Sequence, residues 1–571
     1  MVGAAVSSGT DEAPLLGQER GLVARKRVAP RRTVEDVLTA RNLTLSFGPR
    51  TVISEVDLDV SPGDRIGLSA PNGVGKSTLL KLLASELTPD SGTVTATGAV
   101  AYLTQETEVR QGESLRDHLA RRTGVAKAER WLQQAAEAMA TGGGEDFAQA
   151  LDHWTAVGAG DFAERADIVC EKLGLEADLL DGREAHELSG GQAARLRLAS
   201  VLLAKADVLL LDEPTNDLDG AGLDLLEQHV RASKAAIVLV SHDREFLART
   251  TTAIAELDEF THGVTVYNGG WDAYVEEKAN ARRRAQEEYE TYAAQRDRLT
   301  QRSRQTREWS RQGVRRNAKS GETDKFIRFF NKQGAENLTR KASIVDRQLD
   351  RLEAVEQPRE AWELRLSLPS AGRGSSAVFT LRKAVVERGD VRLGPVDLTI
   401  GAGERWRITG PNGSGKSTLL GALLGRIPLL EGECTMGPGV VVGEVDQLRA
   451  EFASDEPVLR IVASATGLQD VEVRTLLAKF RLGADAVLRP ARELSPGERT
   501  RAGLAVLQAR GTTCLVLDEP TNHLDLPAIE QLEQALDSYD GTLLLVTHDR
   551  RLADAVRVDH EINVPDLLTF P

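Results

Sequence analysis

Two nine-residue stretches have the residue types that bind the phosphates of a nucleotide. Ala70 to Thr78 reads APNGVGKST, and Gly410 to Thr418 reads GPNGSGKST. Glycines let backbone N–H groups surround phosphate oxygens, and the N-terminus of a following helix adds favourable partial charge. The run Arg65 to Ser69 predicts a strand before the first loop, and Leu79 to Leu87 predicts a helix after it. This strand–loop–helix context is the one that a phosphate-binding loop requires.

The loop residues have separate expected roles. Lys76 reaches the β- and γ-phosphates, the hydroxyl of Ser77 ligates Mg²⁺, and the second loop repeats both. Ala70 stands where a glycine is usual, and because alanine avoids only positive φ we expect a mild cost. The residues expected to hold the nucleotide here are Asn72, Gly73, Gly75, Lys76, Ser77, Thr78, Gly410, Asn412, Gly413, Gly415, Lys416, Ser417 and Thr418.

Two apolar runs end in paired carboxylates. VLLLDE ends at Glu213 and LVLDE ends at Glu519. Each pattern predicts a buried strand that places its carboxylates at the strand's end. Asp212 and Asp518 are expected to order the magnesium shell, and the glutamates to polarise the attacking water.

Further motifs stand at fixed places around these carboxylates. LSGGQ at 188–192 and LSPGE at 494–498 precede them, and later strands end at His242 and His548. A lone histidine after a strand is usually structural. Five motifs in the right order, however, predict a site that hydrolyses a nucleotide, with both histidines beside the catalytic glutamates.

The whole set occurs twice. Lys416 follows Lys76 by 340 residues, whereas LSPGE follows LSGGQ by 306 and Glu519 follows Glu213 by 306. The first copy therefore carries about 34 additional residues between its phosphate-binding loop and LSGGQ. We place them around 121–162, as an added helical arm or a longer helical lobe.

A charged run separates the two copies. Residues 276–357 hold 20 Lys+Arg and 14 Asp+Glu, a net charge of +6 in a chain whose net charge is −15. Concentrated positive charge on one element favours contact with a polyanion, and a solvated helical spacer is the alternative. Glu276 to Arg311 and Phe326 to Gln357 have helix-favouring composition, and each would span roughly 50 Å at about 1.5 Å per residue. The turn is expected over Gly313 to Gly321.

Aromatic residues in this run have two expected uses. They could stack on bases, or they could pair the two linker helices. The residues concerned are Trp309, Phe326, Phe329 and Phe330.

The composition places the protein in the cytoplasm. Residues 1–36 predict a disordered tail without the continuous apolar core of a secretory signal, and no apolar run is long enough for a transmembrane helix. Three cysteines are too few for a disulfide framework and lack metal-ligand spacing.

Together these motifs resemble those of the ATP-binding cassette ATPases. Two cassettes in one chain, DEPTN-x-LD in both, and YNGGWDAY at 267–274 before the charged linker resemble the ABC-F class. The resemblance implies an α/β fold with two cassettes joined by a long helical hairpin. We expect a first cassette over 37–274, a linker over 275–357 and a second cassette over 358–571.

The resemblance also implies two composite ATP sites, formed when the cassettes close head to tail. Gln105 and Gln447 would join the serines and aspartates as magnesium ligands, and Phe47 would stack on adenine, although Glu387 stands at the equivalent position. The remaining nucleotide contacts would come from the opposite cassette, through Ser189, Gly190, Gly191, Gln192, Ser495, Gly497 and Glu498.

The class further implies a monomeric ATPase that binds the ribosome, with the linker near the P-site tRNA and the peptidyl transferase centre. Antibiotic resistance by ribosomal protection is the interpretation that we favour. A housekeeping translation factor and, with less support, the ATP-binding subunit of a drug exporter are the alternatives. A DNA-repair ATPase would require zinc-binding cysteine clusters that three scattered cysteines cannot supply.

Overall fold

The computed structural model describes most of the two cassettes and the first half of the linker. The described residues are 36–104, 110, 112–140, 145–175, 177–182, 188, 190–319, 340, 344, 347–348, 376–389, 391–444, 451–452, 454–480, 482–494, 496–521, 524 and 526–568. They belong to one compact unit, Asp36–Pro571.

The first cassette is built on a six-stranded sheet. Its order is β5-β6-β7-β3-β8-β9, parallel except for the antiparallel edge pair β8–β9. Because helices cover both faces of a parallel sheet, its central strands are continuous apolar runs that are buried throughout. The bounds are β3 Arg65–Ser69, β5 Val100–Leu103, β6 Val208–Asp212, β7 Ala236–Val240, β8 Ala253–Leu257 and β9 Val264–Asn268.

A three-stranded antiparallel sheet and nine helices, counted over the described residues, complete this cassette. The sheet has the order β2-β1-β4, with β1 Leu38–Phe47, β2 Arg50–Val60 and β4 Ser91–Ala96. The helices beside the sheets are α1 Lys76–Leu83, α7 Gly190–Leu203, α8 Gly220–Ala232 and α9 Arg244–Thr250. The helical lobe contains α2 Leu115–Arg122, α3 Val125–Ala140, α4 Glu145–Ala156, α5 Phe162–Lys172 and α6 Ala177–Gly182.

The additional residues of the first cassette are helical. α3 and α4 pack against each other, and α3 also packs against α2. Val125 and Ala128 of α3 belong to the same buried core as α2 and α7. The base of the α3–α4 pair is therefore continuous with the lobe.

The second cassette repeats the plan. Its parallel sheet has the order β14-β15-β16-β12-β17, and its antiparallel sheet has the order β11-β10-β13. The strands are β10 Ala377–Arg388, β11 Val391–Gly401, β12 Arg405–Thr409, β13 Glu431–Met436, β14 Val442–Glu444, β15 Cys514–Asp518, β16 Thr542–Val546 and β17 His560–Asn563. The helices are α12 Lys416–Leu423, α14 Val458–Thr466, α15 Asp470–Lys479, α16 Ala484–Leu488, α17 Pro496–Arg510, α18 Leu526–Asp537, α19 Arg550–Ala555 and the short 3₁₀ turns Ala491–Glu493 and Val564–Leu567.

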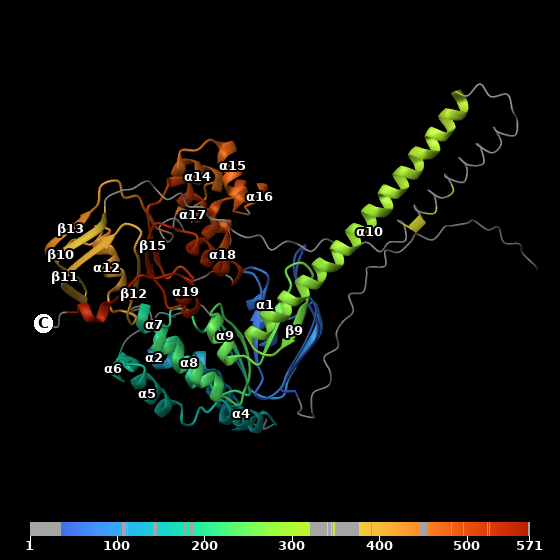
Figure 1. The fold of residues 1–571 in the computed structure, drawn as a ribbon. Helices are drawn as coiled ribbons and strands as arrows, with labels where there is room; N and C mark the ends of the chain where they lie inside the picture. The colour runs from blue at the N-terminus through green and yellow to red at the C-terminus, as the bar shows by residue number, and fades with distance from the viewer. Residues whose placement is uncertain are drawn as a thin grey trace, which may run out of the picture. The chain divides into compact units, whose positions relative to one another are not determined.

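The linker begins as one continuous helix, α10, from Trp271 to Lys319 (Figure 1). At about 1.5 Å per residue it is about 74 Å long. The predicted turn is wrong over 313–319, which are helical. A single glycine costs a helix about 1 kcal/mol, which the helix-favouring Arg, Ala and Lys around Gly313 offset. The predicted second arm, with Phe326, Phe329 and Phe330, lies almost wholly outside the described residues.

None of the described helices is both long and apolar enough to cross a bilayer.

Candidate functional site

Both phosphate-binding loops turn into their helices at a glycine with a left-handed backbone. Gly75 has φ 129° and Gly415 has φ 99°, and they precede α1 and α12. A methyl group on Gly75 would lie 2.5 Å from Val52 Cγ1, and one on Gly415 would lie 2.7 Å from Val391 Cγ1. Both the conformation and the close approach therefore require glycine at these positions.

The loop lysines turn inward onto their own loops. Lys76 Nζ donates to the carbonyl of Ala70 at 2.9 Å and to Asn72 Oδ1 at 3.1 Å. Lys416 Nζ donates to the carbonyl of Gly410 at 2.8 Å. The Ala70 carbonyl thus accepts from Lys76 as the Gly410 carbonyl accepts from Lys416. Ala70 does not have the positive φ that would make alanine costly at this position.

Beside each lysine, a serine hydroxyl meets the aspartate at the end of a buried strand. Ser417 Oγ donates to Asp518 Oδ2 at 2.8 Å, and Ser77 is hydrogen-bonded to Asp212. Tyr102, which the sequence did not single out, also donates to Asp212 Oδ2, at 3.3 Å. Each serine–aspartate pair brings together two oxygen atoms of the kind that Mg²⁺ prefers as ligands. These residues therefore fit the ion. The other predicted ligands, Gln105 and Gln447, lie outside the described residues.

The two glutamates share an unusual backbone. Glu213 has φ 51° and Glu519 has φ 47°, a conformation that non-glycine residues adopt at a cost of order 1–3 kcal/mol. Each backbone N–H is held by the next strand, through the carbonyls of Val240 at 3.0 Å and Val546 at 2.9 Å. The sheet therefore holds this strained backbone conformation at both equivalent positions.

The histidines differ between the two cassettes. His242 Nε2 lies 3.0 Å from Glu213 Oε1. His548 Nε2 lies 3.5 Å from Glu519 Oε1 but 3.1 Å from Lys416 Nζ. Because a lysine ammonium only donates, His548 Nε2 must accept, and we assign the His548 proton to Nδ1. Burial, together with the charge of Lys416, lowers the pKa of His548 to about 4.

The two glutamates consequently have different protonation. Burial disfavours the charge of Glu213, but His242 and Lys76 outweigh burial, and the pKa of the Glu213 carboxyl lies below its ordinary value. Burial raises the pKa of Glu519 to about 7, although the His548 N–H and Lys416 oppose this shift. Near neutral pH, Glu213 is ionised and Glu519 is divided between its two forms.

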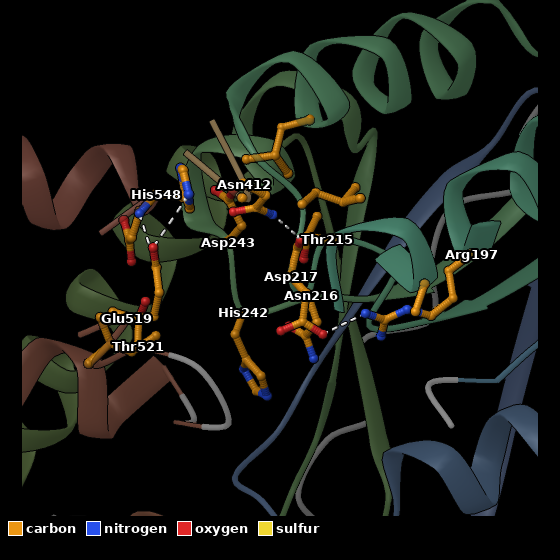
Figure 2. A pocket seen from close by; sticks show the side chains of 17 residues that line it. Arg197, Thr215, Asn216, Asp217, His242, Asp243, Asn412, Glu519, Thr521 and His548 are labelled. Carbon is orange, nitrogen blue, oxygen red and sulfur yellow. Dashed lines mark hydrogen bonds and ion pairs between the residues drawn. The ribbon is translucent and has the colours of Figure 1, made fainter. Parts of the chain in front are cut away.

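The first cassette reaches the second phosphate-binding loop. Asn412 Nδ2 donates to the carbonyl of Asp217 at 2.7 Å, and the Asn412 N–H lies 3.3 Å from Asp219 Oδ2. A methyl group on Gly191 would lie 3.7 Å from Cβ of Asn412. Asn412, Asp217, Glu519 and His548 line one cavity of about 560 Å³. Figure 2 shows Asn412 beside Asp217 in this cavity. Gly191, one of the residues expected to contact nucleotide from the opposite cassette, therefore lies close to the second phosphate-binding loop.

The first loop has a cavity of its own. It measures about 510 Å³, and its described lining comes from the first cassette, including Phe47, Lys76, Asp212 and His242. Phe47 is 54% exposed, so its ring is accessible for stacking on a base. Glu387 is exposed at the matching end of β10 and is paired in register with Arg392.

The predicted opposing residues are described only in part. Ser189 and Ser495 lie outside the described residues. Gly190 and Gly191 open α7 with Gln192, and Gly497 and Glu498 lie in the first turn of α17. Glu498 is bound to Arg489 of its own cassette at 3.1 Å.

Sequence reasoning missed a set of ion pairs between the cassettes. Arg244 binds Glu533, with Nη1 to Oε2 at 3.0 Å, and Arg550 binds Glu227, with Nη1 to Oε1 at 3.0 Å. Both members of the second pair stand 306 residues from those of the first. The repeat offset, applied outside the motifs, was the signal that could have found this reciprocal pairing.

Comparison with known proteins agrees with this architecture. The model of the ABC transporter family matches residues 53–216 and 393–522. The tylosin resistance ATP-binding protein TlrC of Streptomyces fradiae is 35% identical, covering 92% of this chain and 96% of that protein. ABC transporter F family member 2 of Arabidopsis thaliana is 30% identical, covering 98% of this chain and 81% of that protein. The chain belongs to the ABC-F family. It is an ATPase with two ATP-binding cassettes.

Two further similarities extend the comparison of this ABC-F protein. The ribosome protection protein VmlR of Bacillus subtilis is 29% identical over 90% of this chain and 85% of that protein. The archaeal ribosome recycling factor aABCE1, in a crystal structure with a ribosomal stalk protein, superposes with a TM-score of 0.54 at 19% identity, covering 91% of this chain and 87% of that one. At that identity the superposition shows a shared tandem-cassette fold.

If Phe47 stacks on adenine as the resemblance implies, the two sites should bind ATP unequally. Phe47→Ala is expected to weaken ATP binding at the first site by about tenfold, since stacking on an aromatic side chain contributes about 1–3 kcal/mol per base. Glu387→Ala, the matched change in the second cassette, is expected to have little effect. Titration of each variant with a fluorescent ATP analogue measures both, and equal losses would contradict the assignment of Phe47.

Proposed function

We propose that this ABC-F ATPase binds the ribosome and protects it from an antibiotic. ATP, with Mg²⁺ held by Ser77 and Asp212 and by Ser417 and Asp518, closes the cassettes. Closure sets the direction of the linker, which enters the ribosome near the P-site tRNA and the peptidyl transferase centre. Hydrolysis at Glu213 and Glu519 then reopens the cassettes.

One observation carries this proposal. TlrC, named for tylosin resistance, is similar along 96% of its own length, so the similarity includes the linker region as well as the cassettes. VmlR, named as a ribosome protection protein, is similar along 85% of its length. The long helix α10 supports the same function, because its basic residues suit contacts with RNA phosphates, which position without reading sequence.

A housekeeping role in translation is the second candidate. The similarity to ABC transporter F family member 2, over 98% of this chain, favours it, since that name carries no reference to a drug. Both candidates require ribosome binding, and they differ in whether a drug is displaced.

Cell-free translation separates the two. Adding the purified protein with ATP to a reaction inhibited by tylosin is expected to restore protein synthesis. A variant that lacks Arg296 through Lys341 is expected to give no rescue while still hydrolysing ATP. Restored protein synthesis in reactions inhibited by tylosin, or by another drug of a panel, supports ribosomal protection. Stimulation of drug-free translation without rescue of any inhibited reaction would instead favour the housekeeping role.

A further inference from the structure

The first two turns of α10, Trp271 to Lys278, are attached to both cassettes. We call these residues the root of α10. Trp271 and Tyr274 are buried, at 3% and 4% exposure, within the core of the first cassette. Their rings lie 5.2 Å apart, and Tyr274 also packs edge-on against Tyr267 at 5.1 Å.

The attachment to the first cassette leads directly to a phosphate-binding loop. Ser69 is the last residue of β3, next to Ala70, and its side chain is hydrogen-bonded to Tyr274. Glu256 of β8 is the register partner of Ser69, and it forms an ion pair with Lys278. Lys278 Nζ also donates to the Tyr274 hydroxyl at 3.0 Å. Two adjacent strands therefore hold two successive turns of the helix.

Among the described residues, the attachment of the root to the second cassette is one surface ion pair. Arg551 Nη2 lies 2.9 Å from Asp272 Oδ1, and its Nε lies 3.3 Å from Glu245 Oε2. Asp272 is 77% exposed and Arg551 is 29% exposed. Arg551 belongs to α19, which begins two residues after His548. The backbone N–H of His548 donates to Glu519 Oε2 at 3.1 Å. The segment from His548 to Arg551 thus connects the two sites: it is hydrogen-bonded to Glu519 at one end and ion-paired with the root of α10 at the other.

The charges at this contact are reversed between the two halves. Arg551 stands 306 residues after Glu245, so they are equivalent positions of the repeat, and they face each other as an acid and a base. Identical residues here would repel across the contact, as two carboxylates or two guanidiniums. Because this position holds an arginine in the second cassette, Arg551 binds Glu245 of the first cassette and Asp272 of α10 at the same time.

We propose that Asp272 and Arg551 form a breakable latch that positions the linker helix relative to the second cassette, while Tyr274 and Lys278 hold the helix to the first. The strength of each attachment suits its role. Buried rings and a partly buried ion pair keep α10 moving with β3 and β8. An exposed ion pair shifts an equilibrium by only about two- to fivefold, so movement of the second cassette can make or release it.

Distance measurements on the nucleotide-free full-length chain test the latch without ribosomes, and are therefore independent of the proposed function. Spin labels are placed at exposed Glu308 of α10 and exposed Val471 of α15, with Cys434 replaced by serine. Asp272→Arg is expected to reduce the wild-type population of the distance distribution by about two- to fivefold. Glu276→Arg makes the same charge change one turn along, where the described residues show no ion pair, and is expected to leave the distribution unchanged.

Two further variants make the result decisive. The set Glu245→Gln, Asp272→Arg and Arg551→Glu re-forms the ion pair between positions 272 and 551 with its charges reversed, and is expected to restore the wild-type distribution. Glutamine at 245 avoids a second carboxylate beside the one introduced at 551 and still accepts from Arg249, which pairs with Glu245 at 2.7 Å in the wild type. Lys278→Met is expected to broaden a different distance distribution, the one between the label on α10 and a label at Phe260 of the first cassette. Asp272→Arg is expected to leave that distribution unchanged. A distribution for Asp272→Arg that superposes on wild type, or a reversed set that fails to recover it, would overturn the proposal. Broadening of both distances by Asp272→Arg would do the same.

Discussion

Replacing Glu213 and Glu519 together by glutamine is expected to lower steady-state ATP hydrolysis by about 10²- to 10⁴-fold, the usual contribution of a positioned general base. Both glutamates directly follow buried strands, and both have a left-handed backbone that a hydrogen bond to the next strand holds. Glutamine has the same shape, so it preserves the site while removing the group that polarises water. ATP binding is therefore expected to remain.

Phosphate release and the Kd for labelled ATP measure the two effects separately. The variant with Glu129→Gln and Glu433→Gln removes one exposed carboxylate from each cassette and serves as the matched control. Near-wild-type turnover in the Glu213/Glu519 variant would show that neither residue acts in hydrolysis.

The second large effect is a difference in pH dependence between the two sites. The Glu213→Gln variant hydrolyses ATP through Glu519, whose pKa burial raises to about 7. A base acts in its deprotonated form, so this variant's activity is expected to be full above pH 8 and to fall as pH decreases through about 7. Well below that value, the loss approaches about tenfold per pH unit.

The Glu519→Gln variant is expected to behave differently over the same range. It works through Glu213, whose pKa lies below its ordinary value because His242 and Lys76 outweigh burial. Its activity should change little between pH 8 and pH 6. Rates of ATP hydrolysis from pH 5.5 to 8.5 compare the two variants, and superposable profiles would contradict the asymmetry of the histidines.

The chemistry of each site could be predicted from sequence because its residues are local to a motif. A loop that wraps phosphate needs its glycines and lysine within nine positions, and the Asp–Glu pair must follow a buried strand. The structure places Lys76, Asp212 and Glu213 around one cavity. In the second cassette Ser417 donates to Asp518, and His548 lies between Lys416 and Glu519. The repeat of the motifs also indicated two copies of one cassette.

What could not be predicted depends on contacts between distant segments. His242 and His548 stand in nearly identical motifs, yet one approaches a carboxylate and the other a lysine. That choice is made by packing and not by residue type. The same holds for Arg244–Glu533 and Arg550–Glu227, whose members lie outside every motif.

Helix ends were the other source of error. α10 starts five residues before the predicted arm and continues through Gly313. The aromatic and lysine contacts of its root extend the helix backward into the first cassette. Forward, one glycine is too weak a breaker within a run of good helix formers.

Ribosome association governed by nucleotide is the most direct test of the central claim. The Glu213→Gln/Glu519→Gln variant should hold ATP in the closed cassettes, and we expect it to sediment with ribosomes in ATP. Wild type in ADP should remain in the supernatant, and so should the variant once Arg296 through Lys341 are deleted. If the variant stays in the supernatant with ATP bound, or if the deletion sediments equally well, cassette closure does not direct this linker into the ribosome.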